Sequence, residues 1–267
     1  MRNSFLFVAT IAAAVNLMAP PVRAELRPPS ADLNGHALEE KQDKMQSGYI
    51  GETREMTLTL ISAQGDESVR KLRFEGQEGE ARHDKSRLSF TYPADMKGAM
   101  LLTHEQAERD DDQWLYLPAV KRIKRIATAN QSGSFMGSEF AYEDLVVRQL
   151  DKYDFRYIGD ETINGKDCYV IERTPKNKNS GYSRIVRWRM KDNLQELRSD
   201  YYDRKGELLK RRDMMGHHLV DGYWRVSSIL VSNMQTGRKS KLTFDEVQLK
   251  VALPAEHFSV QEFNAAQ

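Results

Sequence analysis

Residues 55–61 read EMTLTLI, and their alternation of apolar and polar side chains decides the fold. Residues 71–75 (KLRFE) and 87–92 (RLSFTY) repeat this period of two. Such a period places the apolar side chains on one face of a β-strand and the polar ones on the other. Turn signals at Gly65-Asp66 and at 76–79 separate the three runs. The sequence therefore predicts antiparallel strands that each have one apolar face.

The second half of the chain follows the same scheme. Asn164-Gly165 is the strongest short hairpin signal in the sequence. Residues 186–190 (VRWRM) again alternate, with arginines between the apolar side chains. The last strand changes phase between Phe244 and Val247, which predicts a β-bulge.

The sequence offers only one good helix candidate near its start. Residues 36–46 follow a possible cap at Asn34 and end before Gly48. Their sparse apolar side chains predict a helix on the surface. A few helices cannot cover so many one-sided strands, so the sheet has to curl on itself. We predict a mainly β (α+β) domain over residues 36–262: a single curved antiparallel sheet that forms an incomplete, half-open β-barrel around a cavity.

Composition narrows the class of protein. The chain has 267 residues, with 40 Lys and Arg against 39 Asp and Glu, one Cys and a mean hydropathy of −0.66. A formal charge of +1 does not suit a general polyanion binder, so we expect no nucleic-acid partner. The single Cys excludes an intramolecular disulfide framework and a multi-cysteine metal site.

The N-terminus has the layout of a secretory signal peptide. Arg2 precedes an apolar run over 5–18, and Val22-Arg23-Ala24 resembles a cleavage site. The run is shorter than the roughly 20 residues that a membrane-spanning helix needs. We expect residues 1–24 to be removed and 25–35 to form a flexible leader. With no Cys near the cleavage point, the predicted product is a soluble periplasmic protein without a lipid anchor.

The central segment carries a basic cluster of four cationic side chains: Lys121, Arg122, Lys124 and Arg125. One interpretation is contact with lipid headgroups or with an acidic partner, since each cation near an anionic membrane contributes about 1 kcal/mol. The other is an edge strand that its charges protect from pairing with further strands. The sequence leaves both open.

Residues 132–138 (SGSFMGS) form a Gly- and Ser-rich loop that nevertheless carries Phe135 and Met136. Large apolar side chains in such a loop require something to pack on. They either plug the core of their own domain or, together with Phe140, form a mobile flap over an apolar cavity. Both interpretations remain open at this point.

Residues 114–126 (WLYLPAVKRIKRI), 132–145 (SGSFMGSEFAYEDL) and 253–259 (LPAEHFS) resemble a known group. They are similar to the outer-membrane lipoprotein-sorting (LolA-like) family, in a branch associated with inner-membrane transporters of the RND type. The resemblance implies an incomplete β-barrel closed by helices, an apolar cavity for acyl chains and a carrier role without catalysis. The arginine that controls the lid of the type carrier has no assignable position in this chain.

Catalytic and metal-binding patterns are weak. Consecutive carboxylates at Asp110-Asp111-Asp112 point in different directions, and neighbouring side chains at His217-His218 face opposite sides of a strand. Phe135 occupies the nucleophile position of the only Gly-x-x-x-Gly loop that resembles a hydrolase elbow. Glu143 and Asp144 are expected to cap or to form ion pairs near the basic cluster. We therefore predict no enzyme, no metal site and no cofactor.

The preferred hypothesis is a monomeric periplasmic carrier that binds the acyl chains of a lipoprotein or lipid and contacts membrane surfaces transiently. The alternative is a periplasmic sensor or adaptor that regulates a membrane protein through the same fold. The candidate lipid-cavity residues are Leu58, Leu60, Leu72, Phe74, Leu88, Phe90, Trp114, Tyr116, Val186, Trp188 and Met190.

Overall fold

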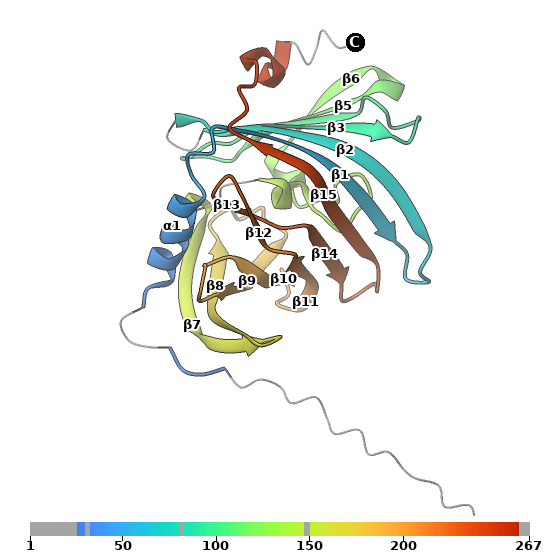
Figure 1. Ribbon diagram of the computed structural model, residues 1–267. Coiled ribbons are helices and arrows are strands. Elements are labelled where there is room, and N and C mark those ends of the chain that lie inside the picture. Colours follow the sequence, from blue (N-terminus) through green and yellow to red (C-terminus); the bar gives the residue numbers. More distant parts are fainter. Residues whose placement is uncertain (1–25, 30–32, 81–82, 147–149, 262–267) are drawn as a thin grey trace, which may run out of the picture.

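The computed structural model describes residues 26–29, 33–80, 83–146 and 150–261. These residues form one strongly curved antiparallel sheet of 13 strands, a two-stranded hairpin and one α-helix (Figure 1). The predicted signal peptide, residues 1–24, lies outside the described residues. No helix in the described part of the chain is long and apolar enough to span a membrane.

The strands of the first half are β1 (Gly51–Ile61), β2 (Glu67–Gln77), β3 (Lys85–Tyr92), β4 (Met100–His104), β5 (Asp112–Leu117) and β6 (Arg122–Ile126). Those of the second half are β7 (Tyr153–Ile163), β8 (Lys166–Pro175), β9 (Tyr182–Met190), β10 (Glu196–Asp203), β11 (Leu208–Met215), β12 (His218–Val220), β13 (Tyr223–Arg225), β14 (Ser228–Asn233) and β15 (Lys239–Leu249). The helices are α1 (Gly35–Met45) and the short 3₁₀ turns η2 (Pro118–Val120), η3 (Thr128–Asn130), η4 (Tyr142–Leu145), η5 (Leu150–Lys152) and η6 (Ala255–Phe258).

Two meanders meet at the centre of the large sheet. The strand order is β6-β5-β4-β3-β2-β1-β15-β14-β11-β10-β9-β8-β7, so β1 and β15 join the two halves. The edges β6 and β7 do not pair with each other, and the sheet stays open. The predicted incomplete β-barrel is therefore confirmed.

The helix prediction is confirmed: α1 lies on the surface, where most of its residues are at least partly exposed and one face is buried. The Asn34 side chain accepts a hydrogen bond from the backbone N–H of His36 at 2.8 Å and caps α1. Leu38 packs with Tyr157 and Ile171 in a small core, so α1 buries one face against β7 and β8. The buried face of α1 needs few apolar side chains because it also buries a charged residue, Glu39.

The predicted hairpin turn and the predicted β-bulge are confirmed, whereas Gly76 and Gln77 of the predicted turn at 76–79 still belong to β2. Asn164 and Gly165 have φ values of 50° and 74°, which is the conformation of a type I′ hairpin turn, and they join β7 to β8. The register between β1 and β15 shifts between Thr53 and Glu55, opposite Glu246 with φ 49°. The change of phase in the last strand is therefore a β-bulge.

Residues 127–146, the crossing segment, follow β6 at one edge of the sheet and lead towards β7 at the other. The segment packs Phe135 and Phe140 into a core cluster with side chains of β1 to β5 and β14. We call the sheet face that carries this cluster the inner face. The connection between two distant edges has to pass the inner face, and its large apolar side chains fill that space.

The expected leader makes at least one contact with the domain. Arg27 forms an isolated antiparallel bridge with Asp160 of β7 through backbone hydrogen bonds of 2.9 and 3.0 Å. Gly159 has a φ of 148°, and a Cβ at this position would lie 2.3 Å from the carbonyl oxygen of Arg27. Only glycine permits this approach of the leader to the edge strand.

Candidate functional site

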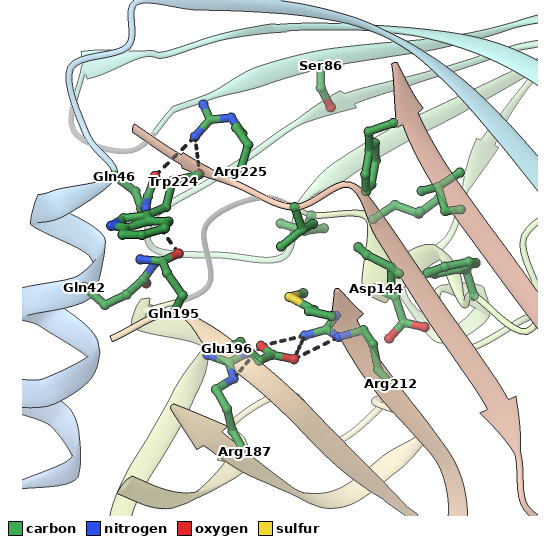
Figure 2. A pocket seen from close by; sticks show the side chains of 18 of the residues that line it. Gln42, Gln46, Ser86, Asp144, Arg187, Gln195, Glu196, Arg212, Trp224 and Arg225 are labelled. Atoms are coloured by element: carbon green, nitrogen blue, oxygen red, sulfur yellow. Dashed lines mark hydrogen bonds and ion pairs between the residues drawn. The ribbon is translucent and has the colours of Figure 1, made fainter. Parts of the chain in front are cut away.

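A cavity of about 390 Å³ lies between α1 and the inner faces of both halves of the sheet (Figure 2). A volume of this size falls in the range of small-molecule sites, which is roughly 300–1,000 Å³. The lining is divided by chemistry. The strands of the first half and β14 and β15 contribute mostly apolar side chains, with Glu52 and Arg54 of β1 as the charged exceptions, whereas α1 and strands β8 to β11 contribute mostly charged ones.

Apolar side chains from one face of the strands and from the crossing segment build the apolar part of the cavity. They include Met56, Phe74, Leu88, Leu101, Phe140, Leu145, Ile229, Leu242 and Phe244. Several of them are only partly buried, among them Leu88 and Phe244. Exposed apolar area inside a cavity is what an acyl chain or another apolar group can cover.

The charged part begins with Glu39 of α1. Arg189 donates to both Glu39 oxygens at 2.6 Å, and Arg187 donates from Nη1 to Oε2 at 2.7 Å. Burial raises the pKa of Glu39, but the two guanidinium groups outweigh burial and lower the pKa from 4.5 to about 2. Glu39 is therefore a carboxylate at neutral pH, and it fixes α1 against β9.

A second carboxylate continues the chain of ion pairs. The Nε of Arg187 lies 2.9 Å from Oε2 of Glu196, and Arg212 donates to both Glu196 oxygens at 2.8 and 2.9 Å (Figure 2). Burial raises the pKa of Glu196, but Arg212 and Arg187 lower it further than burial raises it. Arg189, Glu39, Arg187, Glu196 and Arg212 thus form one continuous buried network.

The hairpin of β12 and β13 borders the cavity. Trp224 lines it, and Arg225 donates to Gln46 after α1 at 3.2 Å (Figure 2). Arg225 also donates to Glu52 of β1 at 2.8 Å. Arg225 also lies over the ring of Tyr49, 5.4 Å from the centroid. These contacts hold the hairpin to both α1 and the first half of the sheet.

The structure places six of the predicted cavity residues on the inner face. Leu58, Leu60, Leu72, Phe74, Leu88 and Phe90 all belong to the core cluster that contains Phe135. Of these, Phe74 and Leu88 line the cavity. The others pack against the crossing segment, which fills the inner face next to the cavity.

Trp114 and Tyr116 require a correction. They pack with Leu102 and Phe258 in a cluster on the opposite face of the sheet, which the turn η6 covers. On β5 it is Leu115 that faces inward and packs in the core cluster. The run was apolar on both faces, so its period did not reveal which face was the inner one.

Val186, Trp188 and Met190 also require a correction. The cavity is lined by Arg187 and Arg189, and strand alternation turns Val186 and Trp188 to the opposite face. There Trp188 donates from Nε1 to Glu161 at 2.7 Å. The prediction assumed that charged side chains face solvent, whereas here they form ion pairs inside the cavity.

The structure places the predicted flap inside the core. Phe135 is 2% exposed, and its ring centroid lies 5.8 Å from Phe90 and 5.6 Å from Tyr142. The backbone N–H of Phe135 donates to the carbonyl of Phe140 at 2.7 Å. These contacts favour the core plug over the flap for Phe135 and Phe140, whereas Met136 is only half-buried.

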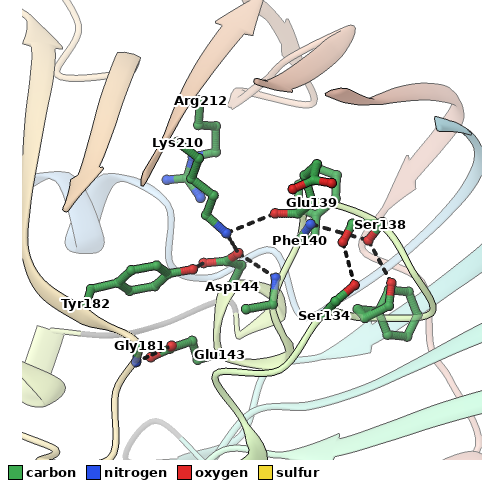
Figure 3. A network of polar contacts seen from close by, with 12 residues as sticks. Ser134, Ser138, Glu139, Phe140, Glu143, Asp144, Gly181, Tyr182, Lys210 and Arg212 are labelled. Carbon is green, nitrogen blue, oxygen red and sulfur yellow. Dashed lines mark hydrogen bonds and ion pairs between the residues drawn. The ribbon is translucent and has the colours of Figure 1, made fainter. Parts of the chain in front are cut away.

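Asp144 holds the crossing segment to the second half of the sheet (Figure 3). It accepts from the backbone N–H of Ala141 at 2.7 Å, from Lys210 Nζ at 2.5 Å and from the Tyr182 hydroxyl at 2.9 Å. Glu143 accepts from the backbone N–H of Gly181 at 2.9 Å. Both acids act as predicted, as caps and ion pairs, but Asp144 pairs with β11 and not with the basic cluster.

The basic cluster lies on β6, the outer strand of the first half, and on the turn before it. Lys121, Arg122, Lys124 and Arg125 are all exposed, and Arg125 forms an ion pair with Asp112. This position is compatible with both interpretations, because an edge strand is also the strand most accessible to a membrane or partner.

The remaining candidate ligands are held apart by their contacts. His217 donates to the carbonyl of Glu196 at 2.8 Å, whereas His218 contacts the carbonyl of Gly216. Asp111 forms an ion pair with Lys152. In the described residues, no group of three or more His, Cys, Asp or Glu side chains is arranged to hold a metal ion.

The sequence prediction missed the charged residues that line the cavity. Glu39, Arg187 and Arg212 gave no motif. Two features of the sequence could have pointed to them. Arg187 and Arg189 alternate along one strand, and Glu39 lies on the apolar side of the helix. Such a signal identifies a buried ion-pair network only when the partner strands are known.

Comparisons with known proteins agree with the fold. A family model described only as an uncharacterized protein matches residues 82–265, and no curated protein matches the chain. A domain described as an outer membrane lipoprotein-sorting protein, from Vibrio parahaemolyticus, is 37% identical. The match covers 86% of this chain and 98% of that one, with a TM-score of 0.83.

Two further structures are similar. A DUF1329 family protein from Desulfovibrio piger is 30% identical, covers 85% of this chain and 97% of its own, and has a TM-score of 0.81. A LolA superfamily protein from Nitrosomonas europaea shares the fold at 20% identity and a TM-score of 0.69, with coverage of 85% and 98%. The chain therefore belongs to the outer-membrane lipoprotein-sorting family and has the fold of the LolA superfamily protein.

Proposed function

We propose that the protein is a carrier that buries the acyl chains of a lipid or lipoprotein in its cavity and performs no catalysis. The observation that carries this proposal is the group of partly buried apolar side chains, among them Leu88, Ile229 and Phe244, that face one cavity of about 390 Å³. Membership of a lipoprotein-sorting family supports the same conclusion.

The energetics suit a carrier that must also release its cargo. Each buried CH₂ group contributes about 0.8 kcal/mol. Part of this gain is offset by the ordering of the ligand and of the side chains around it. A single long acyl chain therefore binds with useful but reversible affinity, as single lipid anchors do at membranes.

Features of the sequence support a wider role in transport between the inner and the outer membrane. The predicted signal peptide supports export to the periplasm, where a carrier can move cargo from the inner towards the outer membrane. The resemblance to an RND-associated branch suggests an inner-membrane transporter as the donor. The exposed cations of β6 offer a surface for transient contact with either membrane or partner.

Mass spectrometry of lipids extracted from the gently purified protein tests the proposal. We expect acylated molecules in stoichiometric amounts. After removal of the lipid, phospholipids with brominated acyl chains should quench the fluorescence of Trp224, which lines the cavity. Absence of both co-purified lipid and quenching would disprove a carrier. Transfer of bound lipid to acceptor vesicles then tests the shuttle role separately.

A further inference from the structure

Tyr201 of β10 has a hydroxyl group that the fold does not pair. The residue is 1% exposed, and in the described part of the chain its hydroxyl oxygen has no hydrogen-bond partner. A buried hydroxyl without a partner costs free energy, because folding removes it from water and does not replace the lost hydrogen bond. Such groups are few in folded proteins, and each requires an explanation other than stability.

The neighbouring Tyr182 of β9 shows the usual arrangement in the same core cluster. Its ring meets the ring of Tyr201 edge to face, with the centroids 5.0 Å apart, and both rings pack with Tyr153 and Ile185. The Tyr182 hydroxyl donates to Asp144 at 2.9 Å (Figure 3). The packing of this cluster uses both aromatic rings, but of the two hydroxyl groups only that of Tyr182 serves the fold.

The charged groups around Tyr201 are engaged with one another. Lys210 and Arg212 lie over its ring, 5.2 and 5.3 Å from the centroid, and such cationic side chains cannot accept a hydrogen bond. Asp144 accepts from Lys210 at 2.5 Å. Glu196 accepts from Arg212 at 2.8 and 2.9 Å. The Tyr201 hydroxyl is therefore a donor that remains available to a ligand.

The Tyr201 hydroxyl lies at the wall of the cavity. Tyr201 lines the cavity, as do the four side chains whose charges act on its hydroxyl, which are Arg212, Asp144, Arg173 and Glu196. Asp144 is followed in the chain by Leu145, which belongs to the apolar part. The hydroxyl therefore stands where the charged and the apolar parts of the cavity meet. Burial raises the pKa of Tyr201 above its usual range, so the hydroxyl stays protonated and can donate.

We infer that the Tyr201 hydroxyl donates a hydrogen bond to the carbonyl oxygen of an acyl ester whose chain occupies the apolar part of the cavity. This inference rests on the proposed function and specifies its substrate class: lipids with ester-linked chains, in preference to lipids with ether-linked chains. The ester carbonyl stands at the head of the acyl chain, so it reaches the boundary of the two parts when the chain fills the apolar part. The hydrogen bond satisfies two groups that burial would otherwise leave unpaired.

Two brominated glycerolipids test the inference by quenching of Trp224, which lines the cavity. One is a diacylglycerol, with ester bonds, and the other is the dialkylglycerol of the same chain length, with ether bonds. The measured quantity is the ratio of the two affinities. This ratio should fall by about two- to ten-fold in Tyr201→Phe, which is the effect of one hydrogen bond, and the loss should lie in the affinity for diacylglycerol.

Melting temperatures of the ligand-free proteins provide a second readout. Tyr201→Phe should keep or raise the melting temperature, because it removes an unpaired buried hydroxyl. Tyr182→Phe is the matched control from the same cluster. It removes a hydroxyl that is hydrogen-bonded to Asp144, so it should lower the melting temperature and keep the wild-type ratio of affinities.

The outcomes separate the two proposals. If Tyr201→Phe shows the wild-type ratio, the hydroxyl does not bind the carbonyl, whereas the carrier proposal stands because both lipids still bind. Binding of neither lipid to the wild-type protein overturns both proposals. A melting temperature that falls as far in Tyr201→Phe as in Tyr182→Phe would show that the hydroxyl serves the fold, and it also overturns the assignment to the ligand.

Discussion

Arg187 of β9 and Glu39 of α1 form a buried ion pair, with Nη1 and Oε2 2.7 Å apart. The pair joins α1 to the second half of the sheet. Because Arg187 also contacts Glu196, a single side chain connects helix, cavity and strand. The stability of the fold is therefore coupled to the electrostatics of the site.

The first prediction concerns pH. The pKa of Glu39 is about 2 in the folded protein against 4.5 ordinarily, so its ionised form stabilises the fold by about 3 kcal/mol at neutral pH. This contribution is present above about pH 4.5 and is lost as the pH falls towards 2. Glu39→Gln should lower the free energy of unfolding at pH 7 by about 3 kcal/mol or more.

Urea unfolding at pH 7 and pH 3 measures this effect. The difference between wild type and Glu39→Gln should shrink by about 2 kcal/mol at pH 3, because the wild type loses part of its advantage. Glu55→Gln is the control, since the exposed pair of Glu55 with Arg73 should contribute less than about 1 kcal/mol. A difference that stays constant with pH would contradict the assigned ionisation.

The strands could be predicted because their inner and outer faces differ in polarity. The alternation over 55–61 and 71–75 became β1 and β2, and Asn164-Gly165 became the turn between β7 and β8. These features depend on neighbours in sequence. Both alternation and turn chemistry are local properties, which is why the sequence alone was sufficient.

The site could be predicted only in part. On β3 the apolar phase that contains Leu88 does face the cavity. On β9 the charged phase faces it, because Arg187 and Arg189 find carboxylates from α1 and β10. Periodicity shows that a strand has two different faces, but which face is the inner one depends on partners that are distant in sequence.

The second prediction tests whether the loop of residues 132–138 plugs the core or forms a mobile flap over the cavity. Phe135→Ala should destabilise the domain by about 3–5 kcal/mol, as truncation of a buried aromatic side chain does. Met136→Ala is the matched control from the same loop and should cost less than half as much, because Met136 is half-buried. Denaturant unfolding measures both. Similar small losses in both variants, with faster lipid release, would support the flap instead.

The third prediction concerns the hairpin that borders the cavity. Arg225→Gln removes the ion pair with Glu52, which keeps its contact with Arg54. We expect faster hydrogen exchange in residues 218–225 and a several-fold faster release of bound lipid, with a small change in global stability. Leu219→Ser, at an exposed position of the same hairpin, should leave both rates unchanged. Equal release rates in all three proteins would show that the hairpin does not limit exit.

The fourth prediction decides between the two interpretations of the basic cluster. A variant with Ser at Lys121, Arg122 and Lys124 retains Arg125, which pairs with Asp112. If the cations contact membranes, binding to anionic vesicles should weaken about a hundred-fold, at about 1 kcal/mol per charge. Vesicle co-sedimentation measures this loss. Unchanged vesicle binding together with self-association of the variant would instead show that the charges protect the edge strand.

The last prediction tests which face of the sheet receives the acyl chain. Leu88 lines the cavity, and Leu88→Asp places a carboxylate where the chain would lie, so binding of diacylglycerol should weaken more than ten-fold. Trp114 was an equally strong candidate from sequence, but it packs on the opposite face beside Phe258. Trp114→Ala should therefore leave the affinity unchanged, even where it lowers the melting temperature. If the folded Trp114→Ala protein loses as much affinity as Leu88→Asp, the cargo does not bind on the inner face.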